Sequence, residues 1–144
     1  MDLTELRRQH RDLAEIATRL AQAIAQRDRP DGVSALRWQL ARQLMTHLAL
    51  EDRILYPTMQ RSGDEKARST ADRLLRETGA LAQAFSTYMT AWSDERITRD
   101  WPGFRAETAA ILKALGDRIR REDDSLYPLA ERLSSPPART ARLG

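Results

Sequence analysis

The sequence predicts an all-α protein, a single antiparallel up-down-up-down four-helix bundle. In four long segments, apolar residues recur at alternating steps of three and four, the spacing that places them on one face of a helix. Breaker residues or polar stretches separate these segments by short connections. No strand-length run alternates with a period of two, so no sheet is expected. Long amphipathic helices with short connections fold most simply as an up-down-up-down bundle.

The first two helices are expected at residues 2–27 and 33–60. The first carries the stripe Leu3, Leu6, His10, Leu13, Ala17, Leu20 and Ile24. Asp2 and Glu5 form a variant of the capping box at its start, and Arg29-Pro30-Asp31-Gly32 end it. The second carries Val33, Leu36, Leu40, Leu44, His47, Glu51 and Leu55, and it fades at Ser62-Gly63.

The last two helices are expected at residues 65–92 and 102–133, with a polar loop from Ser93 to Asp100 between them. Asp64 is the expected N-cap of the third helix, and Pro102 suits the first turn of the fourth. The third carries the unbroken stripe Ala67, Ala71, Leu74, Thr78, Leu81, Phe85, Tyr88 and Trp92. The fourth carries Phe104, Thr108, Ile111, Leu115, Arg118, Glu122, Leu126, Leu129 and Leu133.

The two halves of the chain are similar to each other. The segments 51–57 and 122–128 both read ED-x-x-LYP, at an offset of 71 residues. At an offset of 68, four residues of the first helix match the third: Leu6, Arg8, Leu13 and Ala14 match Leu74, Arg76, Leu81 and Ala82. The sequence therefore predicts two helical hairpins related by a pseudo-twofold axis.

Composition excludes several classes of protein. The 144 residues suit one domain at residues 1–133, and the Ser-, Pro- and Arg-containing segment 134–144 is expected to be a disordered basic tail. Without cysteine, disulfides and thiolate sites are impossible. No apolar run is long enough to span a bilayer or to form a leader, so we expect a cytoplasmic protein without a membrane partner. Arginines interleaved with acids give a net charge of +3 and favour no nucleic-acid partner.

Polar residues interrupt each stripe near its middle. The repeat offsets place them at one level of the bundle, because they pair His10 with Thr78, His47 with Arg118, and Glu51 with Glu122. Two buried carboxylates need positive charge between them. In helical bundles, inward carboxylates and histidines commonly hold a metal ion, and His47 and Glu51 are four residues apart on one helix face. Such ligands suit iron, manganese or zinc.

These motifs resemble the hemerythrin-like family, the HHE cation-binding domains. The resemblance covers roughly residues 3–133 and rests on three motifs: Gln9-His10, His47-Leu-Ala-Leu-Glu51-Asp52 with Leu55-Tyr56-Pro57, and Arg118-Ile-Arg-Arg-Glu122-Asp123 with Leu126-Tyr127-Pro128. It implies a non-haem di-iron centre with histidines from all four helices, and storage or sensing of dioxygen or a response to nitric oxide or peroxide. By resemblance, ligand positions are occupied by His10, His47, Glu51 and Glu122.

Two positions depart from the family pattern. Where the resemblance implies histidines, the third helix has Glu77-Thr78 and the fourth has Arg118, and the chain has no further histidine. A guanidinium has no lone pair for a metal, and its charge repels a cation. We therefore expect Arg118 inside the bundle, in a charge-assisted contact with Glu51 or Glu122, and no di-iron centre.

The state of the centre stays open at this stage. It is metal-free with Arg118 in place of the metal charge, or it holds one ion on the four ligand residues, or it holds two irons with donors from elsewhere, such as Glu77. A haem between His10 and His47 is a further alternative, although the small-residue openings that a haem needs are not evident. A central polar cluster around the ligand positions is expected to contain Thr78, Arg118, Glu77, Tyr56 and Tyr127. The two tyrosines either donate to the central carboxylates or pack at the helix ends.

The expected function is a sensing, regulatory or binding module with a degenerate metal centre rather than an oxygen carrier. The alternative is a functional non-haem iron protein that binds dioxygen, nitric oxide or peroxide through the reduced His/Glu ligand set. No catalytic constellation identifies an enzyme. A homodimer or an unidentified protein partner remains open.

Overall fold

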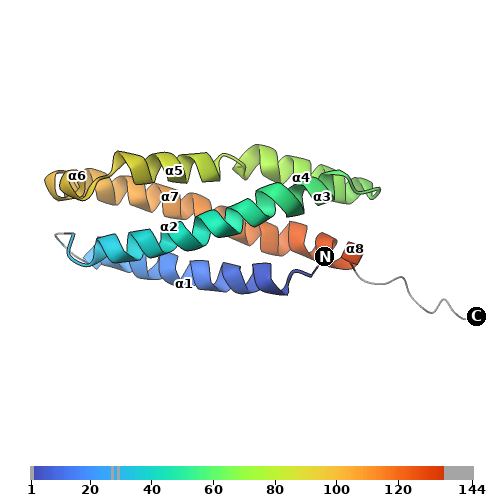
Figure 1. Ribbon diagram of the computed structural model, residues 1–144, viewed down its shortest axis with the longest axis horizontal. Coiled ribbons are helices and arrows are strands. Elements are labelled where there is room, and N and C mark those ends of the chain that lie inside the picture. Colours follow the sequence, from blue (N-terminus) through green and yellow to red (C-terminus); the bar gives the residue numbers. More distant parts are fainter. Residues whose placement is uncertain (1, 27, 29, 135–144) are drawn as a thin grey trace, which may run out of the picture.

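The computed structural model describes residues 2–26, 28 and 30–134, and all regular structure in this part is helical. Four helical rods lie side by side along the long axis, each opposite in direction to the one before (Figure 1). The rods are α1 (Thr4–Gln26); α2 (Val33–Leu50) with η1 (Glu51–Leu55) and α3 (Tyr56–Gln60); α4 (Glu65–Thr78) with α5 (Leu81–Ala91); and α7 (Trp101–Arg121) with η2 (Glu122–Leu126) and α8 (Tyr127–Ser134). The expected all-α bundle is confirmed.

Two connections differ from the expectation. Residues 94–99 form the short helix α6 (Asp94–Arg99) instead of a loop, because the Ser93 hydroxyl caps it by accepting from the Arg96 N–H at 3.1 Å and Ile97 is buried beneath it. The third rod is broken at Gly79, where the Thr78 hydroxyl donates back to the Leu74 carbonyl at 2.7 Å.

The helix starts follow capping chemistry. The Asp64 carboxylate accepts from the Ala67 N–H at 3.0 Å, which confirms this residue as the N-cap of α4. At the start of α1, Asp2 accepts from the Thr4 N–H at 2.9 Å, but Glu5 turns outward to Arg8 instead of completing a capping box. Of the basic tail expected at 134–144, the described part contains only Ser134, which ends α8.

Both copies of the repeated motif fold alike, as π-helical turns. In η1 the Tyr56 N–H donates to the Glu51 carbonyl, and in η2 the Tyr127 N–H donates to the Glu122 carbonyl, so each bond spans five residues. A proline follows directly in each copy, and its missing N–H interrupts the ordinary ladder. Each widened turn therefore begins at one of the two central glutamates, in a type of bulge that is frequent at functional sites.

Polar residues divide the apolar core into two clusters. The larger lies towards the α6 end of the bundle and includes Leu13, Leu20, Leu44, Phe85, Phe104 and Leu115. The smaller lies towards the α3 end and includes Leu3, Leu55, Met59, Ala71, Leu74 and Leu126. Arg37 is also buried, at 1% exposure, and donates to the Trp92 carbonyl at 2.8 Å.

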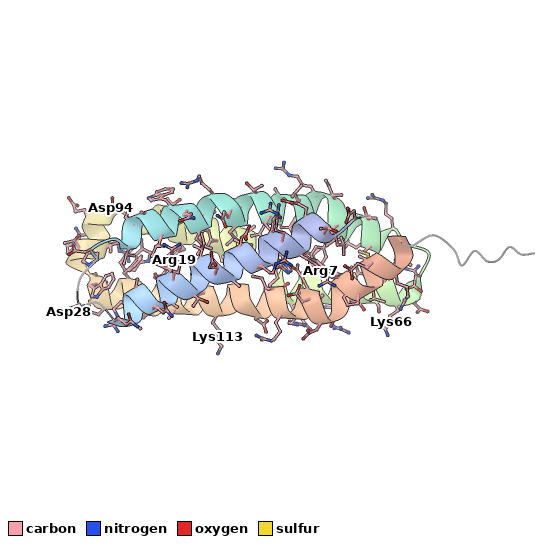
Figure 2. All side chains as sticks on the ribbon, turned by 90° about the horizontal axis from the view of Figure 1, so that it is seen from below. Arg7, Arg19, Asp28, Lys66, Asp94 and Lys113 are labelled. Atoms are coloured by element: carbon pink, nitrogen blue, oxygen red, sulfur yellow. The ribbon has the colours of Figure 1, made fainter. Side chains whose placement is uncertain are left out.

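The first rod packs between the second and the fourth, and Figure 2 shows α1 in front, flanked by α2 and α7. In the same view Asp28 and Asp94 mark one end of the bundle, and Lys66 marks the other (Figure 2). Within the described residues, no helix combines the length and the apolar character that a membrane crossing requires.

Candidate metal centre

The four residues with ligand chemistry meet in the middle of the bundle. One donor atom each of His10, His47, Glu51 and Glu122 lies within 4.8 Å of all the others. These side chains come from α1, α2, η1 and η2, and none is more than 3% exposed. The duplicated pattern of polar residues is therefore one polar layer across the bundle.

Arg118 lies in the same layer and bridges the two glutamates. Its Nε donates to Glu122 Oε2 at 2.9 Å, and its Nη2 donates to Glu51 Oε1 at 3.1 Å. The same Nη2 donates to Asp52 at 2.8 Å. With 1% of its surface exposed, this arginine is the internal cation that charge balance requires.

Each glutamate therefore divides its two oxygens between two neighbours. Glu122 turns Oε2 to Arg118 and Oε1 to His10 Nε2, which lies 3.0 Å away. Glu51 turns Oε1 to Arg118 and Oε2 towards His47 Nε2, at 3.2 Å. The two carboxylates thus lie between a histidine side and an arginine side, as bridging carboxylates lie between two ions.

The two tyrosines of the repeated motif cross over between the halves. The Tyr56 hydroxyl donates to Glu122 Oε2 at 2.8 Å, and the Tyr127 hydroxyl donates to Glu51 Oε2 at 2.5 Å. The reciprocal pairing follows the pseudo-twofold axis of the repeat. Both tyrosines are fully buried and act as neutral donors, because burial and the nearby carboxylates raise the pKa of each above its usual value.

The histidines differ in their outer contacts. His10 Nδ1 lies 2.7 Å from the Asp123 carboxylate, so both nitrogens of this ring face carboxylates. His47 Nδ1 lies 2.7 Å from the amide oxygen of Gln9. His47 Nε2 is buried and makes no aligned hydrogen bond to any described residue, although Glu51 Oε2 is close. The lone pair of this nitrogen is therefore available to coordinate a metal ion.

The pKa values of the layer follow from burial and neighbouring charge. Burial opposes the charge of His10, but hydrogen bonds to Glu122, Glu51 and Asp123 raise its pKa to about 10. Burial, together with the charge of Glu51, raises the pKa of Glu122 to about 7. Burial also works to raise the pKa of Glu51, but the imidazole of His10 beside it holds that pKa well below its usual range. At neutral pH, Glu51 is therefore ionised and His10 is an imidazolium.

When both glutamates are ionised, the layer carries an excess of negative charge. It contains four carboxylates, against which stand the guanidinium of Arg118 and the imidazolium of His10; the carboxylates belong to Glu51, Asp52, Glu122 and Asp123. Arg7 also approaches Asp123, at 3.8 Å, but is paired with Glu131 at 2.7 Å. Such an excess suits a divalent or trivalent cation, and it would grow if His10 released its proton.

Two residues expected in the central cluster lie elsewhere. Glu77 is exposed and forms a surface ion pair with Arg121, because it lies on the outer side of α4. The Thr78 hydroxyl is turned to its own helix, and only the Thr78 carbonyl faces the layer, 3.4 Å from Arg118 Nη1. Neither side chain supplies a donor where the family has a histidine.

Three residues around the buried layer contact its side chains, although the apolar spacing of the helices does not indicate them. Asp52 and Asp123 each follow a central glutamate, and Gln9 precedes His10. All three lie one position beside a stripe, so their side chains approach the layer from its rim and contact Arg118, His10 and His47 respectively. The repeated Glu-Asp pair is the signal that could have pointed to the two aspartates.

The residues on the histidine side fit a metal ion. Two imidazoles and two carboxylates are common ligands of iron, manganese and zinc, and the lone pair available at His47 Nε2 is a free coordination position. On the arginine side the same two carboxylates are occupied by a guanidinium, which cannot coordinate.

Comparison with known proteins identifies the family. Neither the curated proteins nor the solved structures contain a match to this chain. The family model described as the hemerythrin HHE cation-binding domain matches residues 1–130, nearly all of the described chain. Its characteristic ligand types meet here in one buried layer. The chain therefore belongs to the hemerythrin HHE cation-binding domain family.

Proposed function

We propose that this domain is a binding or sensing module built on a one-ion, non-haem metal centre, with iron as the ion, and that it is not a dioxygen store. The observation that carries the proposal is the division of the two carboxylates. Their outer oxygens face two imidazoles and their other oxygens face Arg118. The histidine side would hold a cation, while the guanidinium contacts the other oxygens of the same two carboxylates.

The ion would be held by His47, Glu51, Glu122 and His10, once His10 had lost its proton. When bound, an iron ion supplies one-electron redox chemistry and a position for a small diatomic ligand. The chain holds the two carboxylates in place through Tyr56 and Tyr127, and it excludes bulk water from all four ligand side chains. Because the layer is buried, only small molecules can reach it.

Arg118 limits the centre to one ion. It supplies one fixed positive charge where a second cation would need nitrogen ligands, and a second cation placed there would be repelled. The resemblance implies paired irons in the family, so a one-ion centre departs from that pattern, and we assign this chain to binding or sensing rather than to storage. A metal-free interaction module is the second candidate, and the bridge from Arg118 to both glutamates supports it, because that bridge compensates part of the buried negative charge.

Metal content tests the proposal. Protein from iron-supplemented cells, and protein reconstituted with Fe(II) without oxygen, should contain close to one ion per chain by mass spectrometry. His47→Gln and Glu51→Gln should each abolish binding. Wild-type protein with no iron after reconstitution would support the metal-free module instead, and two ions per chain would overturn the role of Arg118.

Restoring the missing ligands tests the limit of one ion. Arg118→His combined with Thr78→His should raise the content towards two irons per chain. The matched control is Thr18→His combined with Arg105→His, which adds two histidines at the surface groove between α1 and α7. If the control takes up as much additional iron as the restored variant, the extra ion is bound at the surface and the interpretation fails.

A further inference from the structure

A chain of three hydrogen-bonded side chains leads from the surface to His47. The Gln9 amide nitrogen donates to Glu5 Oε2 at 3.2 Å, and the Gln9 amide oxygen lies 2.7 Å from His47 Nδ1. Arg8 donates to both oxygens of the same Glu5 carboxylate, so Gln9 and Arg8 share Glu5 Oε2. Glu5 and Gln9 are four residues apart on α1, so one helix face presents both.

The chemistry of the three groups fixes the direction of every bond. An ionised carboxylate only accepts, so the amide of Gln9 must turn its nitrogen to Glu5 and its oxygen to His47. An amide oxygen also only accepts, so His47 Nδ1 must carry a proton. In the neutral ring the lone pair is then on Nε2.

The position of Nε2 agrees with this assignment. It lies 3.2 Å from Glu51 Oε2 but is not aligned for a hydrogen bond, and no other described residue partners it. The ring is 1% exposed, so water does not readily compensate a wrong tautomer. The lone pair is therefore directed to the histidine side of the layer before any ion arrives.

We propose that Gln9, anchored by Glu5, is a positioning residue that holds the proton of His47 on Nδ1 and so prepares Nε2 as the first ligand of the centre. Its consequence for metal affinity rests on the proposed function, whereas the tautomer does not. His10 has a different outer partner, the carboxylate of Asp123. The two imidazoles are thus prepared differently, one by a neutral amide and one by a charged group.

The test uses the imidazole ¹⁵N spectrum of the whole, chelated protein. The chain has two histidines, so the wild type and His10→Gln together assign His47. In His10→Gln protein we expect Nδ1 protonated and Nε2 unprotonated. Gln9→Met has nearly the same length but no acceptor, and it should give a mixture of tautomers. Gln9→Glu keeps an acceptor and should keep the proton on Nδ1, whereas Gln22→Met, at an exposed glutamine of the same helix, should change nothing.

Metal affinity gives the second measurement. Removal of such an outer partner of a ligand typically weakens binding about 10- to 100-fold, so Gln9→Met should raise the Kd for Fe(II) or Co(II) by that factor. Gln9→Glu should recover most of the loss. Unchanged tautomer populations in Gln9→Met would overturn the positioning role, even if metal binds. Wild-type protein that shows the expected tautomer but binds no metal would refute the proposed function and leave the role of Gln9 intact.

Discussion

Replacing Arg118 by methionine should destabilise the metal-free protein by an amount that the contacts of the arginine set. The guanidinium donates to Glu51, Glu122 and Asp52, and the two glutamates are at most 1% exposed. Methionine fills much of the same volume but removes the guanidinium from both buried carboxylates and leaves them only the imidazolium of His10. The cost is therefore mainly electrostatic.

The expected loss of unfolding free energy is about 3–5 kcal/mol, the range for breaking a buried ion pair from one side. For a domain of this size, it corresponds to a fall in Tm of roughly 10–20 °C. Near neutral pH the loss of unfolding free energy should lie in the lower part of this range. The pKa of Glu122 is already raised to about 7, so this residue can accept a proton and lose its unpaired charge. Above neutral pH the loss should grow, since protonation becomes more expensive.

The assay is urea unfolding in the presence of a chelator, followed by circular dichroism, with Arg37→Met as the matched control. Arg37 is equally buried, at 1% exposure, but it bonds to the Trp92 carbonyl and makes no ion pair with a described carboxylate. The buried charge of Arg37 is offset only by a carbonyl and by aromatic faces, and burial lowers its pKa, so the loss of stability in Arg37→Met should be smaller. The difference between the two variants isolates the charge pairing of the central layer.

Added divalent metal should then rescue Arg118→Met more than the wild type. A ligand at about 100 times its Kd stabilises the folded state by about 2.7 kcal/mol. The reasoning fails if Arg118→Met is no less stable than Arg37→Met in chelator. It also fails if the destabilisation disappears at high pH, where the unpaired carboxylates should be most costly.

Two further predictions concern pH and capping. The pKa of His10 is raised from 6.5 to about 10 in the folded protein, so its stabilising contribution is complete below pH 6.5 and is lost as the pH rises towards 10. The stability difference between chelated wild type and His10→Gln should therefore shrink over this window, by on the order of a few kcal/mol; a constant difference would contradict the assignment of His10 as a cation. Asp64→Ala should cost about 1 kcal/mol through loss of its bond to the Ala67 N–H, and exposed Asp28→Ala should cost almost nothing in the same urea titration.

The sequence predicted the four rods because their apolar spacing persists over many turns. It did not predict the break at Gly79, since the stripe continues in phase from Leu74 through Thr78 to Leu81. The six residues of α6 span less than two turns, too short for periodicity to emerge. The π-helical turns were equally hidden, because Glu51 and Leu55 are both buried at the spacing of an ordinary helix.

The central residues could be predicted because the repeat relates them in pairs. A polar residue on one apolar stripe does not by itself indicate a site. The 71-residue repeat, however, relates Glu51 to Glu122 and so predicts that both lie at one level of the bundle. The outer partners could not be found in this way, because a stripe records which face is buried and not which neighbouring side chain turns inward. Glu77 was placed in the layer for that reason, since its position beside Thr78 does not show that its carboxylate turns outward to Arg121.

The polar layer between two apolar clusters also determines how the helices align. Sliding one rod by a single turn, about 5.4 Å, would still bring apolar side chains opposite apolar side chains in both clusters. The same slide would bring Glu51 or Glu122 opposite aliphatic side chains and leave Arg118 without an acceptor. A single buried polar position fixes register in coiled coils by this penalty. In this bundle the charged layer selects one longitudinal alignment of the four rods among several that the apolar residues alone would tolerate.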